Sequence, residues 1–113
     1  IDREGTGKGY DLDLTSRIVA AVDVPVIACG GAGSVQDVAS VLEAGASAAS
    51  LASVLHYHVA RRIAADPTEF AEAINLAHLD KPGFGRITDA GVDEIKTHLA
   101  ERGYHSRPLF TRV

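Results

Sequence analysis

Residues 24–33 read Val-Pro-Val-Ile-Ala-Cys-Gly-Gly-Ala-Gly, an apolar run that ends in three glycines within four residues. A continuous apolar run bounded by proline and glycine is typical of a short strand that is buried on both faces of a parallel sheet. Glycines lack a Cβ atom, so their main-chain N–H groups can approach an anion closely. This stretch therefore predicts a buried strand over residues 25–29 and, directly after it, a turn suited to a phosphate group.

A second glycine-rich turn lies near the start of the chain. Residues 2–11 read Asp-Arg-Glu-Gly-Thr-Gly-Lys-Gly-Tyr-Asp. If a strand precedes Ile1, both turns follow the C-terminal ends of strands, where ligands bind in open α/β sheets and in (β/α)₈ barrels. Ser53 is expected near the end of the next strand, where its hydroxyl and N–H groups could complete the same rim. Two such turns indicate a phosphorylated ligand.

Helical and strand-like stretches alternate along the first half of the chain. Apolar residues recur at helical spacing in two places, with Asp11 or Asp13 as the expected cap of the first helix and Ser34 as the cap of the second. The predicted elements are a helix over residues 12–22, a strand over 25–29, a helix over 35–44 and a tightly packed strand over 48–55. This order predicts an α/β fold with a parallel sheet and right-handed crossovers.

Composition limits the possible partners and the location of the protein. The 113 residues are 46% hydrophobic and carry a formal net charge of −4, which argues against nucleic acid or an anionic membrane as the main partner. Cys29 is the single cysteine, and we expect it to be a small buried residue rather than a nucleophile. No signal peptide or membrane-spanning stretch is visible, so a cytoplasmic protein is expected. A start at Ile1 without any Met favours a piece of a longer reading frame.

Four motifs together resemble one known family. They are residues 1–6 (Ile-Asp-Arg-Glu-Gly-Thr), 9–11 (Gly-Tyr-Asp), 25–33 and 51–56 (Leu-Ala-Ser-Val-Leu-His). In this order they are similar to the closing third of the cyclase subunit of imidazole glycerol phosphate synthase. The resemblance runs from Ile1 to about Tyr57 and resumes from about Val92 to Arg107. A lone Gly-Gly-Ala-Gly would be weak, whereas the combination is specific.

The resemblance implies the C-terminal part of a TIM (β/α)₈ barrel that spans residues 1–113. It places Ile1 at the end of the sixth strand, residues 25–29 in the seventh and residues 48–54 in the eighth. Members of the family are lyases of histidine biosynthesis. They take ammonia from a glutaminase subunit and convert a bisphosphorylated ribonucleotide to imidazole glycerol phosphate and an aminoimidazole carboxamide ribotide. Their acid and base aspartates lie upstream, so the resemblance implies no catalytic residue in this chain, no metal and no cofactor.

The loops after the seventh and eighth strands form one of the family's two phosphate sites. Carried over position by position, the resemblance gives the expected substrate and phosphate site as Asp2, Glu4, Gly5, Gly30, Gly31, Ala32, Gly33, Ala52 and Ser53. Glu4 stands where the family usually has aspartate, so its carboxylate reaches one methylene farther. Without the resemblance, these acidic residues would more simply satisfy loop N–H groups, because turns favour aspartate for that purpose.

Residues 59–91 form an insertion where relatives have a short connection, and loops of this length are often functional. Just before it, His56 and His58 alternate at strand spacing, for which a rim or interface role is favoured over a metal pair because no third ligand has matching spacing.

Two other functions stay open. One is an ammonia-using barrel that amidates a surface sugar, and another is a non-catalytic partial barrel that binds phosphate and associates with the missing upstream part. The related isomerase of the same pathway is disfavoured, because it typically lacks the pattern that residues 52–56 approximate.

Overall fold

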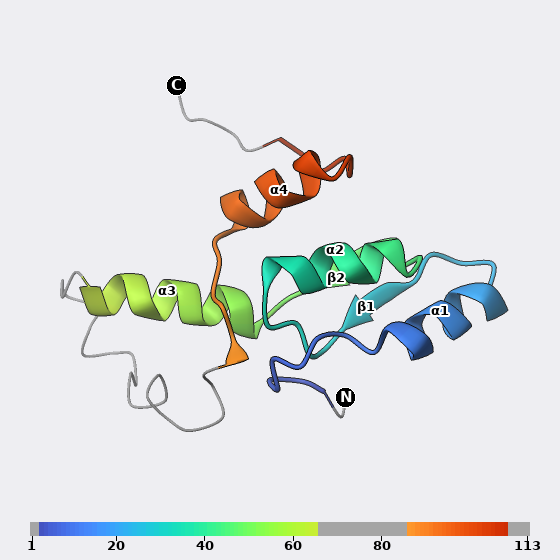
Figure 1. Ribbon diagram of the computed structural model, residues 1–113, viewed down its shortest axis with the longest axis horizontal. Coiled ribbons are helices and arrows are strands. Elements are labelled where there is room, and N and C mark those ends of the chain that lie inside the picture. The colour runs from blue at the N-terminus through green and yellow to red at the C-terminus, as the bar shows by residue number, and fades with distance from the viewer. Residues whose placement is uncertain (1–2, 66–85, 109–113) are drawn as a thin grey trace.

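The structure of the chain is a computed structural model that describes residues 3–65 and 86–108. Asp2 and most of the expected insertion, residues 66–85, lie outside the described residues. The elements are α1 (Leu12–Ala21), β1 (Ile27–Cys29), α2 (Val35–Glu43), β2 (Ala48–Ser50), α3 (Ser53–Ala65) and α4 (Val92–Glu101). Figure 1 shows this helix and strand alternation along the first half of the chain.

The two strands pair in parallel, as the sequence predicts. Ile27 lies opposite Ala48, and Cys29 lies opposite Ser50. The connection from β1 to β2 runs through α2, which is the βαβ unit of a parallel sheet. The predicted parallel α/β arrangement is therefore confirmed.

Local capping explains where the first two helices begin. Oδ1 of Asp11 accepts a hydrogen bond of 3.0 Å from the main-chain nitrogen of Leu14, at the start of α1. Oγ of Ser34 accepts one of 3.3 Å from the nitrogen of Asp37, at the start of α2. Each cap satisfies a donor that the helix itself leaves unpaired. Asp11, rather than Asp13, is the cap of α1, and the predicted cap of α2 is confirmed.

The second strand is shorter than predicted, because α3 begins where the strand was expected to continue. The strand ends at Ser50, and the carbonyl of Ala52 already accepts a hydrogen bond of 2.9 Å from the nitrogen of His56. Val54, Tyr57 and Ala60 are the buried residues of this helix. Their spacing of three is helical, so the apolar character of this stretch comes from one helix face rather than from a two-sided strand. His56 and His58 therefore lie on a helix and not at strand spacing.

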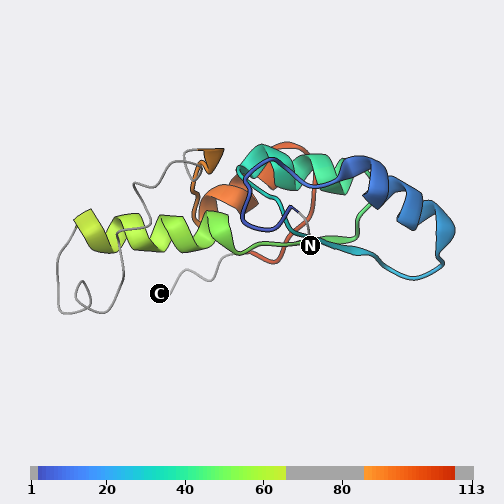
Figure 2. The same cartoon turned by 90° about the horizontal axis from the view of Figure 1, so that it is seen from below.

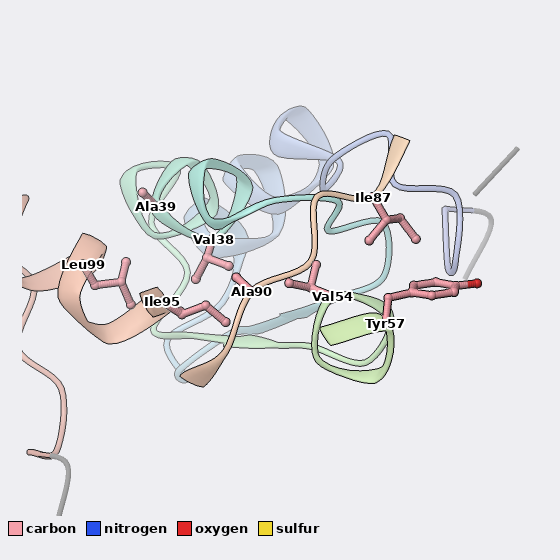
Figure 3. Close-up of a cluster of buried hydrophobic side chains, with 8 residues drawn as sticks. All are labelled: Val38, Ala39, Val54, Tyr57, Ile87, Ala90, Ile95 and Leu99. Carbon is pink, nitrogen blue, oxygen red and sulfur yellow. The ribbon is translucent and has the colours of Figure 1, made fainter. Parts of the chain in front are cut away.

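Two hydrophobic clusters form the core of the described chain, and neither contains a residue of α1. The larger one, drawn in Figure 3, joins α2, α3 and α4 to the segment before α4, and consists of Val38, Ala39, Val54, Tyr57, Ile87, Ala90, Ile95 and Leu99. The smaller one packs Tyr10 and Ala28 against Val41 and Ala46. Viewed along the edge of the sheet, α1 and α2 lie on the same side of the strands (Figure 2).

The opposite face of the sheet is not covered by the described residues. Successive side chains of β1 alternate, so Ala28 enters the core while Ile27 is 66% exposed and Cys29 is exposed. The expectation that Cys29 is buried is therefore wrong. Its side chain lies on the face away from α1 and α2, where neither helix reaches it. The expected burial of the strand on both faces is likewise wrong for residues 3–65 and 86–108.

Candidate functional site

The two glycine-rich turns lie directly against each other. The main-chain nitrogen of Gly9 donates a hydrogen bond of 2.8 Å to the carbonyl oxygen of Gly31. Gly31 has φ +101°, and a Cβ atom on it would overlap the Gly9 carbonyl oxygen. A Cβ on Gly33 would likewise overlap the carbonyl oxygen of Gly7. The packing of the two turns therefore requires glycine at positions 31 and 33, whether or not a ligand is bound.

Seven of the nine expected site residues line one small hollow of about 30 Å³. The hollow lies where both strands end, because the last residues of β1 and β2, Cys29 and Ser50, also line it. The seven are Glu4, Gly5, Gly30, Gly31, Ala32, Ala52 and Ser53. We call this the rim hollow. Its volume is enough for about two water molecules, so it admits the end group of a ligand rather than a whole nucleotide.

The structure places Gly33 outside the rim hollow. Its main-chain nitrogen donates a hydrogen bond of 2.8 Å to Oδ2 of Asp37, and its carbonyl oxygen accepts one of 2.7 Å from the nitrogen of Thr88. Both polar groups of Gly33 are therefore engaged within the protein. Of the nine residues, Asp2 is the one that lies outside the described residues.

The rim hollow sits at the N-terminus of α3, since Ser53 is the first residue of that helix. The first N–H groups of an α-helix have no partner within the helix, and the helix dipole makes this end positive. The first turn of α3 contains no acidic residue whose carboxylate would occupy this positive end. Because Ser53 opens a helix rather than closing a strand, it offers its hydroxyl together with the donors of a helix N-terminus, which is more favourable for an anion than the strand end expected from the sequence.

Arg3 is the basic residue next to Glu4 in the sequence, but its side chain is turned away from the rim hollow. Nη2 of its guanidinium group lies 3.8 Å from Oδ2 of Asp11, and Nη1 donates to the carbonyl oxygen of Tyr10 at 3.5 Å. No Lys or Arg is among the residues that line the rim hollow. Among the described residues, the donors available to an anion there are therefore main-chain N–H groups and the Ser53 hydroxyl, while Glu4, also in the lining, carries a carboxylate that would repel it.

Tyr10 connects the first turn to the end of β2, a role that the sequence did not reveal. Its hydroxyl donates a hydrogen bond of 2.8 Å to the carbonyl oxygen of Ser50, and its side chain is buried. Burial raises the pKa of Tyr10 to about 12, and the nearby Cys29 and Asp37 groups add to the rise electrostatically. The residues around Tyr10 could not have identified this role, because the partner of its hydroxyl lies forty residues away in the sequence.

His58 is paired with a carboxylate near the end of the expected insertion. Nδ1 of His58 lies 3.2 Å from Oδ2 of Asp89, and Nε of Arg61 lies 3.2 Å from Oδ1 of the same residue. Within residues 3–65 and 86–108, no group of three or more His, Cys, Asp or Glu side chains is arranged to hold a metal ion. This pair ties α3 to the segment that precedes α4.

A larger hollow of about 460 Å³ is a different site. It shares no residue with the rim hollow. Four carboxylates are among its lining residues, those of Asp89, Asp93, Glu94 and Glu101. Such a lining repels a phosphate, so size alone does not identify the site for an anion. No helix in the described part of the chain is long and apolar enough to cross a membrane.

Comparison with known proteins gives one family and one group of relatives. A family model described as "Histidine biosynthesis protein" matches residues 1–61. The imidazole glycerol phosphate synthase subunit HisF of Alkaliphilus metalliredigens is 58% identical over 59 residues, which are 51% of this chain and 23% of that protein. The HisF subunits of Petrotoga mobilis and Hyphomonas neptunium are 52% and 55% identical over 59 and 58 residues, or 52% and 50% of this chain and 23% of each relative. The chain thus spans about a quarter of the length of these relatives.

Proposed function

The chain belongs to the family of histidine biosynthesis proteins, and from this premise we propose that residues 1–113 are the C-terminal part of the (β/α)₈ barrel of a cyclase subunit of imidazole glycerol phosphate synthase. The complete protein would be a cytoplasmic lyase. It would use ammonia from a glutaminase subunit to form imidazole glycerol phosphate and an aminoimidazole carboxamide ribotide from a bisphosphorylated ribonucleotide. This part of it would supply one of the two phosphate sites.

The observation that supports the proposal most is the position of the rim hollow. It lies at the C-terminal ends of two adjacent parallel strands, which is where the phosphate site of a (β/α)₈ barrel is often formed by the last two loops. On this assignment β1 and β2 are the seventh and eighth barrel strands. Their uncovered face, with Ile27 and Cys29, would then point into the barrel interior.

The residues of the rim hollow would bind and orient the phosphate. Main-chain N–H groups of Gly30, Gly31 and Ala32 and of the first turn of α3 would donate to its oxygens, together with the Ser53 hydroxyl. Glu4 would face the hydroxyl-bearing part of the substrate, since a carboxylate repels phosphate. The acid and base aspartates of the family would come from upstream strands. The 113 residues alone are therefore expected to show no cyclase turnover, even with saturating ammonium.

The identity of the relatives favours the histidine pathway over sugar amidation. Three relatives at 52–58% identity are all imidazole glycerol phosphate synthase subunits. A phosphate site at the barrel rim fits both substrates, so the rim hollow itself does not separate them.

The test is a titration of the 113-residue chain with inorganic phosphate, in which amide chemical shifts are monitored at each phosphate concentration. We expect saturable shifts at the amides of Gly31 and Ser53. The Ser53→Ala variant should bind about threefold to tenfold more weakly, the size of one lost hydrogen bond. Ser47→Ala, at the residue just before β2 and so at the end of that strand away from the rim hollow, is the matched control and should bind like the wild type. Equal affinities in the wild type and Ser53→Ala would contradict the site.

A further inference from the structure

Residues 86–91, which we call the strap, lie across the glycine-rich turns. The main-chain nitrogen of Thr88 donates a hydrogen bond of 2.7 Å to the carbonyl oxygen of Gly33. Next to it, Ile87 is 4% exposed and packs in the larger hydrophobic cluster, where its side chain points toward Val54 and Tyr57 of α3 (Figure 3). A Cβ on Gly7 would lie 2.8 Å from Cγ1 of Ile87, so the strap also packs closely on the first turn.

Asp89 fastens the strap to α3. Each of its carboxylate oxygens has its own partner on that helix, with Nδ1 of His58 at 3.2 Å from Oδ2 and Nε of Arg61 at 3.2 Å from Oδ1. The Asp89 side chain is only 19% exposed, so water weakens these contacts less than it weakens surface pairs. Glu94 lies at a longer 4.0 Å from His58 Nδ1 and accepts a hydrogen bond of 2.7 Å from the nitrogen of Gly91.

Two consecutive residues thus connect the two sides of the rim hollow. The main chain of Thr88 holds the turn that contains Gly31, and the side chain of Asp89 holds the helix that begins with Ser53. Asp89 itself is not among the residues that line the rim hollow. An effect of Asp89 on a ligand there would therefore have to pass through the positions of these two elements.

We propose that Asp89 is a positioning residue for the phosphate site, which holds the Gly33 turn and the N-terminus of α3 at the spacing that a phosphate requires. The inference rests on the proposed function. It goes beyond that function because the strap lies outside residues 1–61, the part that matches the family. In this chain the last residues of the expected insertion therefore act on the phosphate site from outside it.

The experiment compares four forms of the 113-residue chain: wild type, Asp89→Ala, Asp89→Asn and the control Asp93→Asn. Asp93 is an exposed carboxylate that lines the large hollow beside Asp89, so its change removes a similar charge while leaving the strap tied. Amide hydrogen exchange of Thr88 reports whether its hydrogen bond to the carbonyl oxygen of Gly33 is formed. Amide shifts of Gly31 and Ser53 during titration with inorganic phosphate report affinity.

In Asp89→Ala we expect Thr88 exchange to accelerate by about tenfold and phosphate affinity to fall by about threefold to tenfold, while amides in the middle of α2 keep their exchange rates. Asp89→Asn keeps an oxygen acceptor, so its Thr88 exchange rate and its phosphate affinity should lie between those of Asp89→Ala and the wild type. Asp93→Asn should match the wild type. If Asp89→Ala does not fold, the same comparison is made with Asp89→Asn.

Two results would overturn the inference. One is unchanged Thr88 exchange and unchanged affinity in Asp89→Ala. The other is an equal acceleration at Thr88 and throughout α2, which would mean general destabilisation rather than positioning. A failure of the proposed function looks different, because the wild type would then show no saturable response to phosphate, while Thr88 exchange would still report on the tie.

Discussion

The main-chain nitrogen of Gly33 donates a hydrogen bond of 2.8 Å to Oδ2 of Asp37, a carboxylate from the first turn of the helix that follows it. This carboxylate occupies the positive end of α2, where an external anion would otherwise be attracted. At the start of α3, by contrast, the first turn contains no acidic residue. The two helix N-termini beside the glycine-rich turn are therefore not equivalent, and a phosphate is expected at α3.

Asp37→Asn tests the charge of this internal carboxylate. The amide oxygen can still accept the hydrogen bond from Gly33, but the negative charge that helps to raise the pKa of Tyr10 is lost. We expect the pKa of Tyr10 to fall below about 12 yet stay above 10.0, because burial is the larger cause of the rise. A titration followed by absorbance of the phenolate measures it. Asp13→Asn, on the exposed side of α1, is the control and should leave the pKa unchanged.

Stability at high pH should depend on Tyr10. Its pKa is about 12 in the folded chain and 10.0 when it is unperturbed, so the folded state holds the phenol proton more tightly. The stability gained from this is complete below about pH 10 and is lost as the pH rises toward 12. Denaturant unfolding between pH 8 and pH 11 should therefore show a falling free energy of unfolding. Tyr10→Phe removes this titration, and an equally steep fall in that variant would contradict the prediction.

Local signals in the sequence predicted the caps and the order of elements. Asp11 and Ser34 cap helices through groups three residues away, so the whole interaction lies within one short window of sequence. The end of β2 could not be predicted in the same way. Small apolar residues from Ala48 onward fit both a buried strand and one face of a helix, and only the packing of Val54 and Tyr57 decides between them.

The sequence predicted which residues line the candidate site, but not the contacts that hold them in place. The family resemblance brought together seven residues that line one hollow, among them Glu4, Gly31 and Ser53. The contacts that hold them, from Tyr10 to Ser50 and from Thr88 to Gly33, join residues far apart in the chain. No spacing rule relates such pairs, because they depend on how the elements pack.

Gly31→Ala should destabilise the chain more than a similar change at another glycine. The new Cβ would overlap the Gly9 carbonyl oxygen and would sit on a residue with φ +101°. We expect a loss of more than about 2 kcal/mol in the free energy of unfolding. Gly103→Ala is the matched control, since Gly103 also has a positive φ but has open space around it, and it should cost about 1 kcal/mol. Equal losses, measured by urea unfolding, would mean that the contact between the two turns is not close.

At concentrations low enough that the chain is monomeric, Cys29 should react readily with a thiol reagent and be protected by phosphate. The side chain is exposed, and the residue lines the rim hollow together with Gly31 and Ser53. A bound phosphate would therefore restrict access to the sulfur. The rate of reaction with a disulfide reagent, with and without saturating inorganic phosphate, measures this. In Ser53→Ala the same phosphate concentration should protect less, and identical rates with and without phosphate in the wild type would place the anion elsewhere.

Association of the chain should depend on the uncovered face of the sheet. Ile27, the first residue of β1, is 66% exposed on that face, and within residues 3–65 and 86–108 no further strand pairs with the outer edge of β1 or β2. We expect the wild type to form oligomers whose size grows with concentration in sedimentation velocity. Ile27→Lys should shift the chain toward the monomer, because a charge opposes burial against another copy, while its effect on stability stays within about 0.5 kcal/mol.

The matched control for this prediction is Val24→Lys. Val24 is 67% exposed but lies before the strand, so the same charge is added at equal exposure without touching the sheet face. It should leave the sedimentation coefficient as in the wild type. If Val24→Lys disperses the oligomers as well as Ile27→Lys does, general charge repulsion rather than the sheet face controls association. A wild type that sediments as a monomer at all concentrations would show that the uncovered face does not attract another copy.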